Sequence, residues 1–269
     1  MSKIGVIHYN FPDFDLDEFL QYCVETGYGY TELNIADVWD EEDPDAQPEK
    51  QAEALREKME GMGLKVCAVS ARNDFLVEGQ DALDEQIERM DRVCRLAKVL
   101  GTDVLRTEGG WAKDGIEEST WVPLIIAGLN RCAELGEQHE VRFALDNHGH
   151  VTNDGDRQLT IFQEVDSPRV GANLDTMNYR WAGHDLDTIR RFYDILAPYT
   201  FHTHMKDGTG SGENYQGAAL GEGEIDLEYA VRTLKAAGYD GVWTAEYEGP
   251  EPEGGVGYAK CYRWLEENV

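Results

Sequence analysis

Four short apolar runs of this chain each end in two polar side chains that stand two residues apart. The pairs are Asp146 and His148, Asn173 and Asp175, His202 and His204, and Glu246 and Glu248. Successive side chains of a β-strand point to opposite faces, so both members of a pair share one face. A (β/α)8 barrel gathers the carboxyl ends of its strands around one point. The pairs therefore predict an α/β fold, the TIM barrel.

Strand and helix patterns alternate along the whole chain. Short apolar runs predict strands at residues 3–8, 29–34, 64–70, 103–107, 141–146, 169–175, 199–205 and 240–246. Helices are expected at 16–26, 49–61, 81–100, 117–139, 157–165, 186–196, 227–238 and 258–267. No linker interrupts them, so we expect residues 1–269 to form a single domain. The glycine-rich stretch 208–223 is expected as a loop whose backbone N–H groups could meet a phosphate.

The charge of the chain is extreme. It carries 53 acidic and 24 basic residues, for a formal net charge of −29, and the acids are spread along the sequence. Their mutual repulsion costs stability at low ionic strength and is screened by salt, so we interpret the composition as halophilic. A nucleic-acid backbone needs a basic footprint, so this composition excludes nucleic acid as a partner.

The remaining composition indicates a cytoplasmic protein. We see no apolar run long enough to span a membrane and no signal peptide, and we expect no membrane partner. The five cysteines are scattered without a CxxC pair, which is typical of reduced core thiols. Self-association into a homo-oligomer is left open.

Four of the strand-end residues form a set suited to a metal ion. Asp146, Asp175, His204 and Glu246 come from the fifth to eighth predicted strands, one each. Three carboxylates and one imidazole suit one hard or borderline divalent ion, with Mn²⁺ first and Mg²⁺, Co²⁺ or Zn²⁺ as alternatives. Such an ion would keep positions open for a polyol. Glu32, Ser70 and Arg106 also fall at strand ends, where ordinary satisfied polar residues are expected.

The order and spacing of several motifs resemble one family. FALDNHGH, ANLDTMN, HTHMKDG and TAEYEG, together with RTEGG after the fourth strand, are similar to motifs of the xylose isomerase-like TIM barrels, which include sugar phosphate isomerases and epimerases. The resemblance covers essentially the whole chain. It implies a divalent metal on Asp146, Asp175, His204 and Glu246.

Three positions depart from the family pattern. Asp146 stands where the family has glutamate, so the metal must shift toward the fifth strand or a water must bridge. Asn178 stands where a histidine is usual, and Thr152 where ketose 3-epimerases have a second glutamate. The segment after the seventh strand lacks the Asp-x-His pair of the family's multi-zinc nucleases, which disfavours a nuclease.

These observations favour a metal-dependent isomerase or epimerase of a small sugar or polyol carbonyl compound. Glu246 is expected as metal ligand and base, with His148, His202 and Lys206 as candidates for the second acid or base. Candidate substrate-binding residues are His8, Arg72, Glu108, Trp111 and Asn178. A keto-polyol dehydratase of the inosose type is one alternative, and a non-catalytic or partner-dependent sugar-binding barrel is another.

Overall fold

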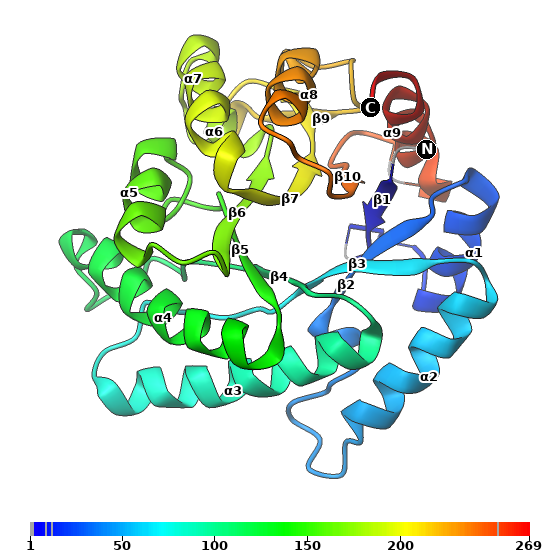
Figure 1. Ribbon diagram of the computed structural model, residues 1–269. Coiled ribbons are helices and arrows are strands. Elements are labelled where there is room, and N and C mark those ends of the chain that lie inside the picture. Colours follow the sequence, from blue (N-terminus) through cyan, green and yellow to red (C-terminus); the bar gives the residue numbers. More distant parts are fainter. Residues whose placement is uncertain (1–2, 9, 12, 252) are drawn as a thin grey trace.

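The computed structural model describes residues 3–8, 10–11, 13–251 and 253–269. Eight parallel strands close into a barrel in the order β1-β10-β7-β6-β5-β4-β3-β2, so the predicted TIM barrel is confirmed (Figure 1). The barrel strands are β1 (Ile4–Ile7), β2 (Tyr30–Asn34), β3 (Lys65–Ser70), β4 (Val104–Thr107), β5 (Arg142–Asp146), β6 (Val170–Asp175), β7 (Thr200–Met205) and β10 (Trp243–Ala245).

Helices surround the barrel on the outside (Figure 1). They are α1 (Leu16–Thr26), α2 (Pro48–Gly61), α3 (Gln80–Leu100), α4 (Glu118–His139), α5 (Gly155–Val165), α6 (Asn178–Trp181), α7 (Leu186–Leu196), α8 (Leu227–Ala236) and α9 (Val256–Asn268). Local chemistry fixes their ends. Asp15 and Glu18 form a reciprocal capping box at the start of α1, and Gly27 and Gly101 end α1 and α3 in the left-handed conformation.

The strand register brings the polar strand ends to one level. Asp146 of β5 lies opposite Asn173 of β6, while Asp175 of β6 lies opposite His204 of β7. All four of these side chains are fully buried. Charged groups are expensive to bury unless they are paired or bound to a metal, so these positions define the place to examine for function.

A short helix and a two-stranded hairpin were absent from the sequence prediction. The short helix α6 follows β6, and the stretch expected as a glycine-rich loop contains an antiparallel hairpin of β8 (Asp207–Thr209) and β9 (Gln216–Ala218). Asp207 explains how that stretch is ordered, because its carboxylate accepts hydrogen bonds from the backbone N–H groups of Gly208, Gly221, Gly223 and Ile225. Three of the N–H groups that we considered for a phosphate therefore bind Asp207.

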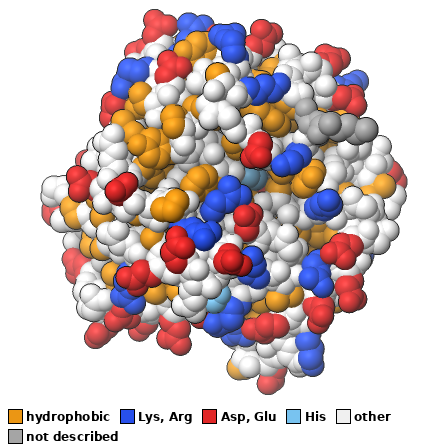
Figure 2. Space-filling model, viewed as in Figure 1, with side chains coloured by type: hydrophobic (Ala, Val, Ile, Leu, Met, Phe, Trp, Pro, Cys, Tyr) orange, Lys and Arg blue, Asp and Glu red, His pale blue; other side chains and the backbone are white. Residues whose placement is uncertain are grey.

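The charges on the surface and the state of the cysteines agree with the composition. Acidic side chains are scattered over the face shown in Figure 2, with basic ones among them. All five cysteines are free and buried, as expected of core thiols. Of the helices that the structure describes, none combines the length and the apolar character that crossing a bilayer would need.

Candidate active site

Three of the four predicted metal ligands meet inside the barrel. One ligand atom each from Asp175, His204 and Glu246 lies within 4.8 Å of the other two, and all three side chains are buried. They come from the ends of three neighbouring strands, β6, β7 and β10. Two carboxylates and an imidazole form an oxygen-rich donor set for a divalent cation.

Two atoms of this cluster are unsatisfied within the described part of the chain. Asp175 Oδ2 and His204 Nδ1 are buried without a hydrogen-bond partner there. His204 Nδ1 lies 2.9 Å from Glu246 Oε2, outside the geometry of a hydrogen bond. Burial raises the pKa of Asp175 to about 7, and the charges of Glu246 and Asp146 add to this shift. Two unsatisfied ligand atoms in a buried set of two carboxylates and an imidazole fit a divalent cation, with Lys206 balancing part of the negative charge.

Glu32 fixes the orientation of His204 from the other side. Its Oε2 lies 2.7 Å from His204 Nε2 and 2.7 Å from His202 Nε2. Burial opposes the ionised form, but the two imidazoles outweigh it and hold the pKa of Glu32 below its ordinary value. The contact directs the Nδ1 atom of His204 toward Asp175 and Glu246, which is the usual role of a carboxylate behind a metal-binding histidine.

Asp146 has other partners. Arg106 donates to its Oδ2, and Asn173 donates to its Oδ1 over 2.6 Å. Despite burial, the Arg106 charge holds the pKa of Asp146 well below its ordinary value. Asp146 is thus outside the group formed by Asp175, His204 and Glu246. The backbone carbonyl of Asp146 accepts the Thr152 hydroxyl over 2.6 Å, so the residue at the epimerase glutamate position supports β5.

Lys206 is the buried cation of the cluster. Its Nζ lies 2.9 Å from Glu246 Oε1, 2.9 Å from Glu248 Oε1 and 3.3 Å from Asn178 Oδ1. These carboxylates and Asp175 raise the pKa of Lys206 well above its ordinary value although burial opposes this. The amide of Asn178 also donates to the Asn147 carbonyl, so Asn178 orients Lys206 from a fixed position.

A cavity of about 620 Å³ opens above the cluster at the carboxyl ends of the strands. We call it the mouth cavity. Its described lining consists of Asn10, Asn34, Ser70, Arg72, Arg106, Glu108, Trp111, His148, Glu246 and Glu248. Trp111 is 51% exposed and meets the His148 ring edge-on at 5.5 Å. Burial opposes protonation, but Asp146 raises the pKa of His148 above its ordinary value.

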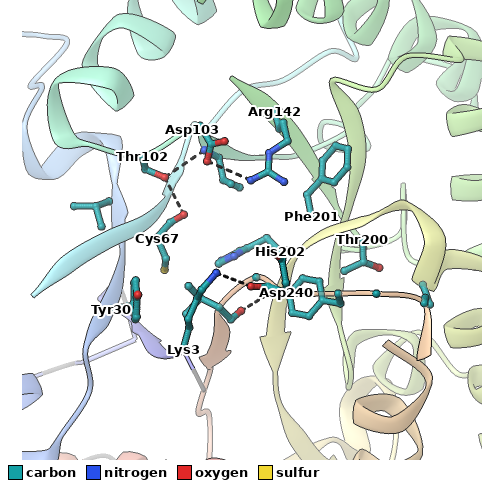
Figure 3. Close-up of a pocket in the computed structure, with 18 of the residues that line it drawn as sticks. Lys3, Tyr30, Cys67, Thr102, Asp103, Arg142, Thr200, Phe201, His202 and Asp240 are labelled. Atoms are coloured by element: carbon teal, nitrogen blue, oxygen red, sulfur yellow. Dashed lines mark hydrogen bonds and ion pairs between the residues drawn. The ribbon is translucent and has the colours of Figure 1, made fainter. Parts of the chain in front are cut away.

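Two predicted site residues lie elsewhere. His8 packs on the Phe19 ring, its Nδ1 lies 3.0 Å from both carboxylate oxygens of Asp37, and the mouth cavity's described lining does not include it. His202 lines a different cavity of about 530 Å³ at the amino ends of the strands (Figure 3). In that cavity Lys3 donates to the Asp240 carbonyl and Arg142 to the Asp103 carboxylate.

Sequence reasoning missed three contributors. Glu32 and Arg106 were expected to be ordinary satisfied residues, yet they hold the imidazoles and Asp146. Asn173 was visible as the partner of Asp175 in the two-residue spacing, and this spacing was the signal for its role. Glu32 on β2 contacts His204 on β7 across the barrel, whereas Arg106 on β4 contacts Asp146 on the neighbouring strand β5. In neither case does a local sequence pattern identify the partner.

Comparisons with known proteins agree with this architecture. The chain is 24% identical over 247 residues to the inosose isomerase of Bacillus licheniformis, covering 88% of this chain and 85% of that one. It is 25% identical over 176 residues to an uncharacterized protein of Methanocaldococcus jannaschii, covering 61% of this chain and 59% of that one. The solved structure of an IolI protein with a bound zinc atom superimposes with a TM-score of 0.78 at 19% identity, covering 99% and 96% of the two chains. A model of the xylose isomerase-like TIM barrel family matches residues 20–268, and the chain belongs to that family.

Proposed function

We propose that this protein is a metal-dependent isomerase or epimerase of a small sugar or polyol carbonyl compound, of the inosose type. The observation that carries the proposal is the buried group of Asp175, His204 and Glu246 with two unsatisfied ligand atoms, placed below the mouth cavity. The inosose isomerase name of the Bacillus licheniformis relative supports the substrate class. The zinc in the IolI neighbour supports a divalent ion.

Asp175, His204 and Glu246 would hold the ion, which we propose to be Mn²⁺ in native material. When bound, it would polarise the substrate carbonyl and stabilise negative charge that develops on oxygen. Asp146 remains our predicted fourth ligand, and it would have to release Arg106 to reach the ion.

Two groups that line the mouth cavity can move protons. Lys206 and His204 hold the pKa of Glu246 below its ordinary value although burial opposes this, which keeps Glu246 ionised as a base for the proton next to the carbonyl. His148 has a raised pKa and lines the same cavity, so it can return a proton as an acid. Lys206 positions Glu246 and Glu248. His202 supports Glu32 instead of facing the substrate.

A metal-supplemented screen of sugars and inososes tests this function. The protein would be supplied with Mn²⁺ in concentrated KCl and D₂O, and NMR would follow each compound. We expect deuterium at the carbon next to the carbonyl, and product, without loss of water. Glu246→Gln should abolish the exchange, whereas His139→Gln, on α4 beside Asp91, should not. Loss of water would identify the dehydratase instead, and metal binding with no turnover of any sugar would indicate the binding barrel.

A further inference from the structure

Arg72, just after strand β3, has an unusual backbone conformation. Its φ is +52°, in the left-handed region that side chains other than glycine rarely adopt. The other described non-glycine residues with positive φ, Glu140 and Asp166, end helices α4 and α5, where this conformation is ordinary. Arg72 follows strand β3 and ends no helix. An unusual backbone at a cavity suggests a functional reason.

The residues on both sides of Arg72 are held in place. The Ala71 N–H donates to the Arg106 carbonyl over 2.9 Å, and the Ala71 carbonyl accepts from Arg89 over 2.7 Å. Asn73 exchanges two hydrogen bonds with the backbone of Glu108, at 2.7 and 3.0 Å. These contacts fix the chain before and after Arg72, and its side chain lines the mouth cavity.

Among the described residues that line the mouth cavity, the charged groups are paired, with one exception. Glu108 binds Arg106, and both Glu246 and Glu248 bind Lys206. Arg72 has neither an ion pair nor a hydrogen bond within the described part of the chain, although acidic residues outnumber basic ones by 53 to 24. In the cavity at the amino ends of the strands, by contrast, both Lys3 and Arg142 have partners (Figure 3).

We propose that Arg72 binds an anionic oxygen group, a carboxylate or a phosphate, on the substrate of this site. This inference rests on the proposed function and, among sugar and polyol carbonyl compounds, favours an acidic one over the neutral inososes. A guanidinium offers a planar fork of donors that matches two oxygens of such a group. Arg72 is exposed at the rim of the cavity, and a neutral sugar would leave its guanidinium facing water.

Calorimetry on the Mn²⁺-loaded protein in high salt tests the inference. The probes are sets of one sugar that differ only in a terminal hydroxyl, carboxylate or phosphate. We expect at least one of the two anionic forms to bind about tenfold or more tighter than the neutral form, the range of a charge-assisted hydrogen bond. Arg72→Gln should remove that preference and leave the neutral form unchanged. Lys65→Gln, an exposed lysine at the amino end of the same strand, is the matched control and should keep the preference.

The calorimetric results distinguish between the two anions and can overturn the inference. Tighter binding of the carboxylate or of the phosphate identifies which anion Arg72 meets. The inference is overturned if the neutral form binds as tightly as both anionic forms, or if Arg72→Gln weakens all forms equally. Proton exchange measured by NMR on the same sugars judges the proposed function separately. If a sugar binds through Arg72 but shows no proton exchange, the proposed function is rejected and the anion site stands. If exchange occurs and does not depend on Arg72, the anion site is rejected and the proposed function stands.

Discussion

At the scale of single residues, Glu32 decides how His204 can act. One carboxylate oxygen contacts Nε2 of both His202 and His204 at 2.7 Å, in a fully buried position. A histidine that donates from Nε2 keeps Nδ1 free, and here Nδ1 is the unsatisfied atom that faces the other proposed ligands. The proposed metal-binding form of His204 thus depends on Glu32, a residue of β2.

Replacing Glu32 by glutamine should weaken metal binding without destroying the barrel. The neutral amide oxygen accepts more weakly than the carboxylate, so it holds the two imidazole N–H groups, and with them the tautomer of His204, less firmly. We expect the Mn²⁺ dissociation constant to rise by about 10–100-fold, the range for residues behind metal ligands. Calorimetric titration of the metal-free protein measures it. Asp37→Asn, which alters a carboxylate beside His8, is the control, and unchanged affinity in Glu32→Gln would remove Glu32 from this role.

A variant at Asp146 can distinguish between two roles of this carboxylate, that of a metal ligand and that of an ion-pair partner. Because Arg106 and Asn173 already bind both of its oxygens, Asp146→Ala should lower the free energy of unfolding by about 3 kcal/mol through loss of a buried pair. The fall in Mn²⁺ affinity should be smaller than that caused by Asp175→Ala. Denaturant unfolding and calorimetry measure the two effects. The smaller loss is expected because Asp146 would have to release Arg106 to reach the ion. Unchanged affinity in Asp146→Ala would remove Asp146 from the proposed ligands, and an equal and severe loss in both variants would make it as strong a ligand as Asp175.

The candidate site was partly predictable for a physical reason. The two-residue period of a strand places Asp175, His204 and Glu246 on the inner face, so their meeting followed from sequence. Two contacts were not foreseeable: Glu32 reaches His204 from β2, and Arg106 reaches Asp146 from β4. The residue to which a buried polar side chain binds depends on how side chains pack inside the barrel. A local sequence pattern carries no information about that packing.

At the scale of elements, the eight barrel strands were predictable because each is a short apolar run between helices. The hairpin of β8 and β9 was not, because its sequence is rich in glycine and has no alternation of apolar and polar residues. Its order depends on Asp207, whose carboxylate receives four backbone N–H groups. Gly223 is required beside it, since a Cβ there would lie 2.1 Å from Asp207 Oδ1.

Asp207→Ala should therefore destabilise this segment strongly. It leaves buried N–H donors without an acceptor, and we expect the free energy of unfolding to fall by about 3 kcal/mol. Urea unfolding measures the change, and limited proteolysis should cut the 208–223 segment first. Asp187→Ala removes a carboxylate with 94% exposure and should change stability by under about 0.5 kcal/mol. Similar stabilities for the two variants would show that Asp207 does not order the hairpin.

At the scale of the whole molecule, the net charge of −29 sets the conditions for folding. The acids surround the barrel, and their repulsion is screened over about 3 Å in 1 M salt but over about 30 Å at 0.01 M. We expect the melting temperature to rise from low to multimolar KCl. Calorimetric melts at several KCl concentrations measure this, and an equal or higher melting temperature without salt would contradict the halophilic interpretation.

The buried thiols add a pH limit at the alkaline end. Burial raises the pKa of Cys94 to about 12 and that of Cys261 to about 12, and it raises the pKa of the other three cysteines as well. In the unfolded chain a thiol loses its proton near pH 9, its ordinary value. Above that pH the folded chain therefore holds more protons than the unfolded chain, and stability must fall as pH rises.

Each buried thiol should contribute a loss of up to about 1.4 kcal/mol per pH unit between about pH 9 and its folded pKa. Urea unfolding in high KCl at several pH values from about 8 to 11 gives the slope. Cys94→Ala should lower the free energy of unfolding at every pH, because core packing is lost. It should also make the fall of that free energy with pH shallower by the contribution of one thiol, and this difference in slope is what the experiment measures. Asp187→Ala, which removes an exposed carboxylate and no thiol, should keep the parent slope. A parent protein equally stable at about pH 8 and pH 10.5 would show that these thiols ionise as easily in the folded chain as in the unfolded one.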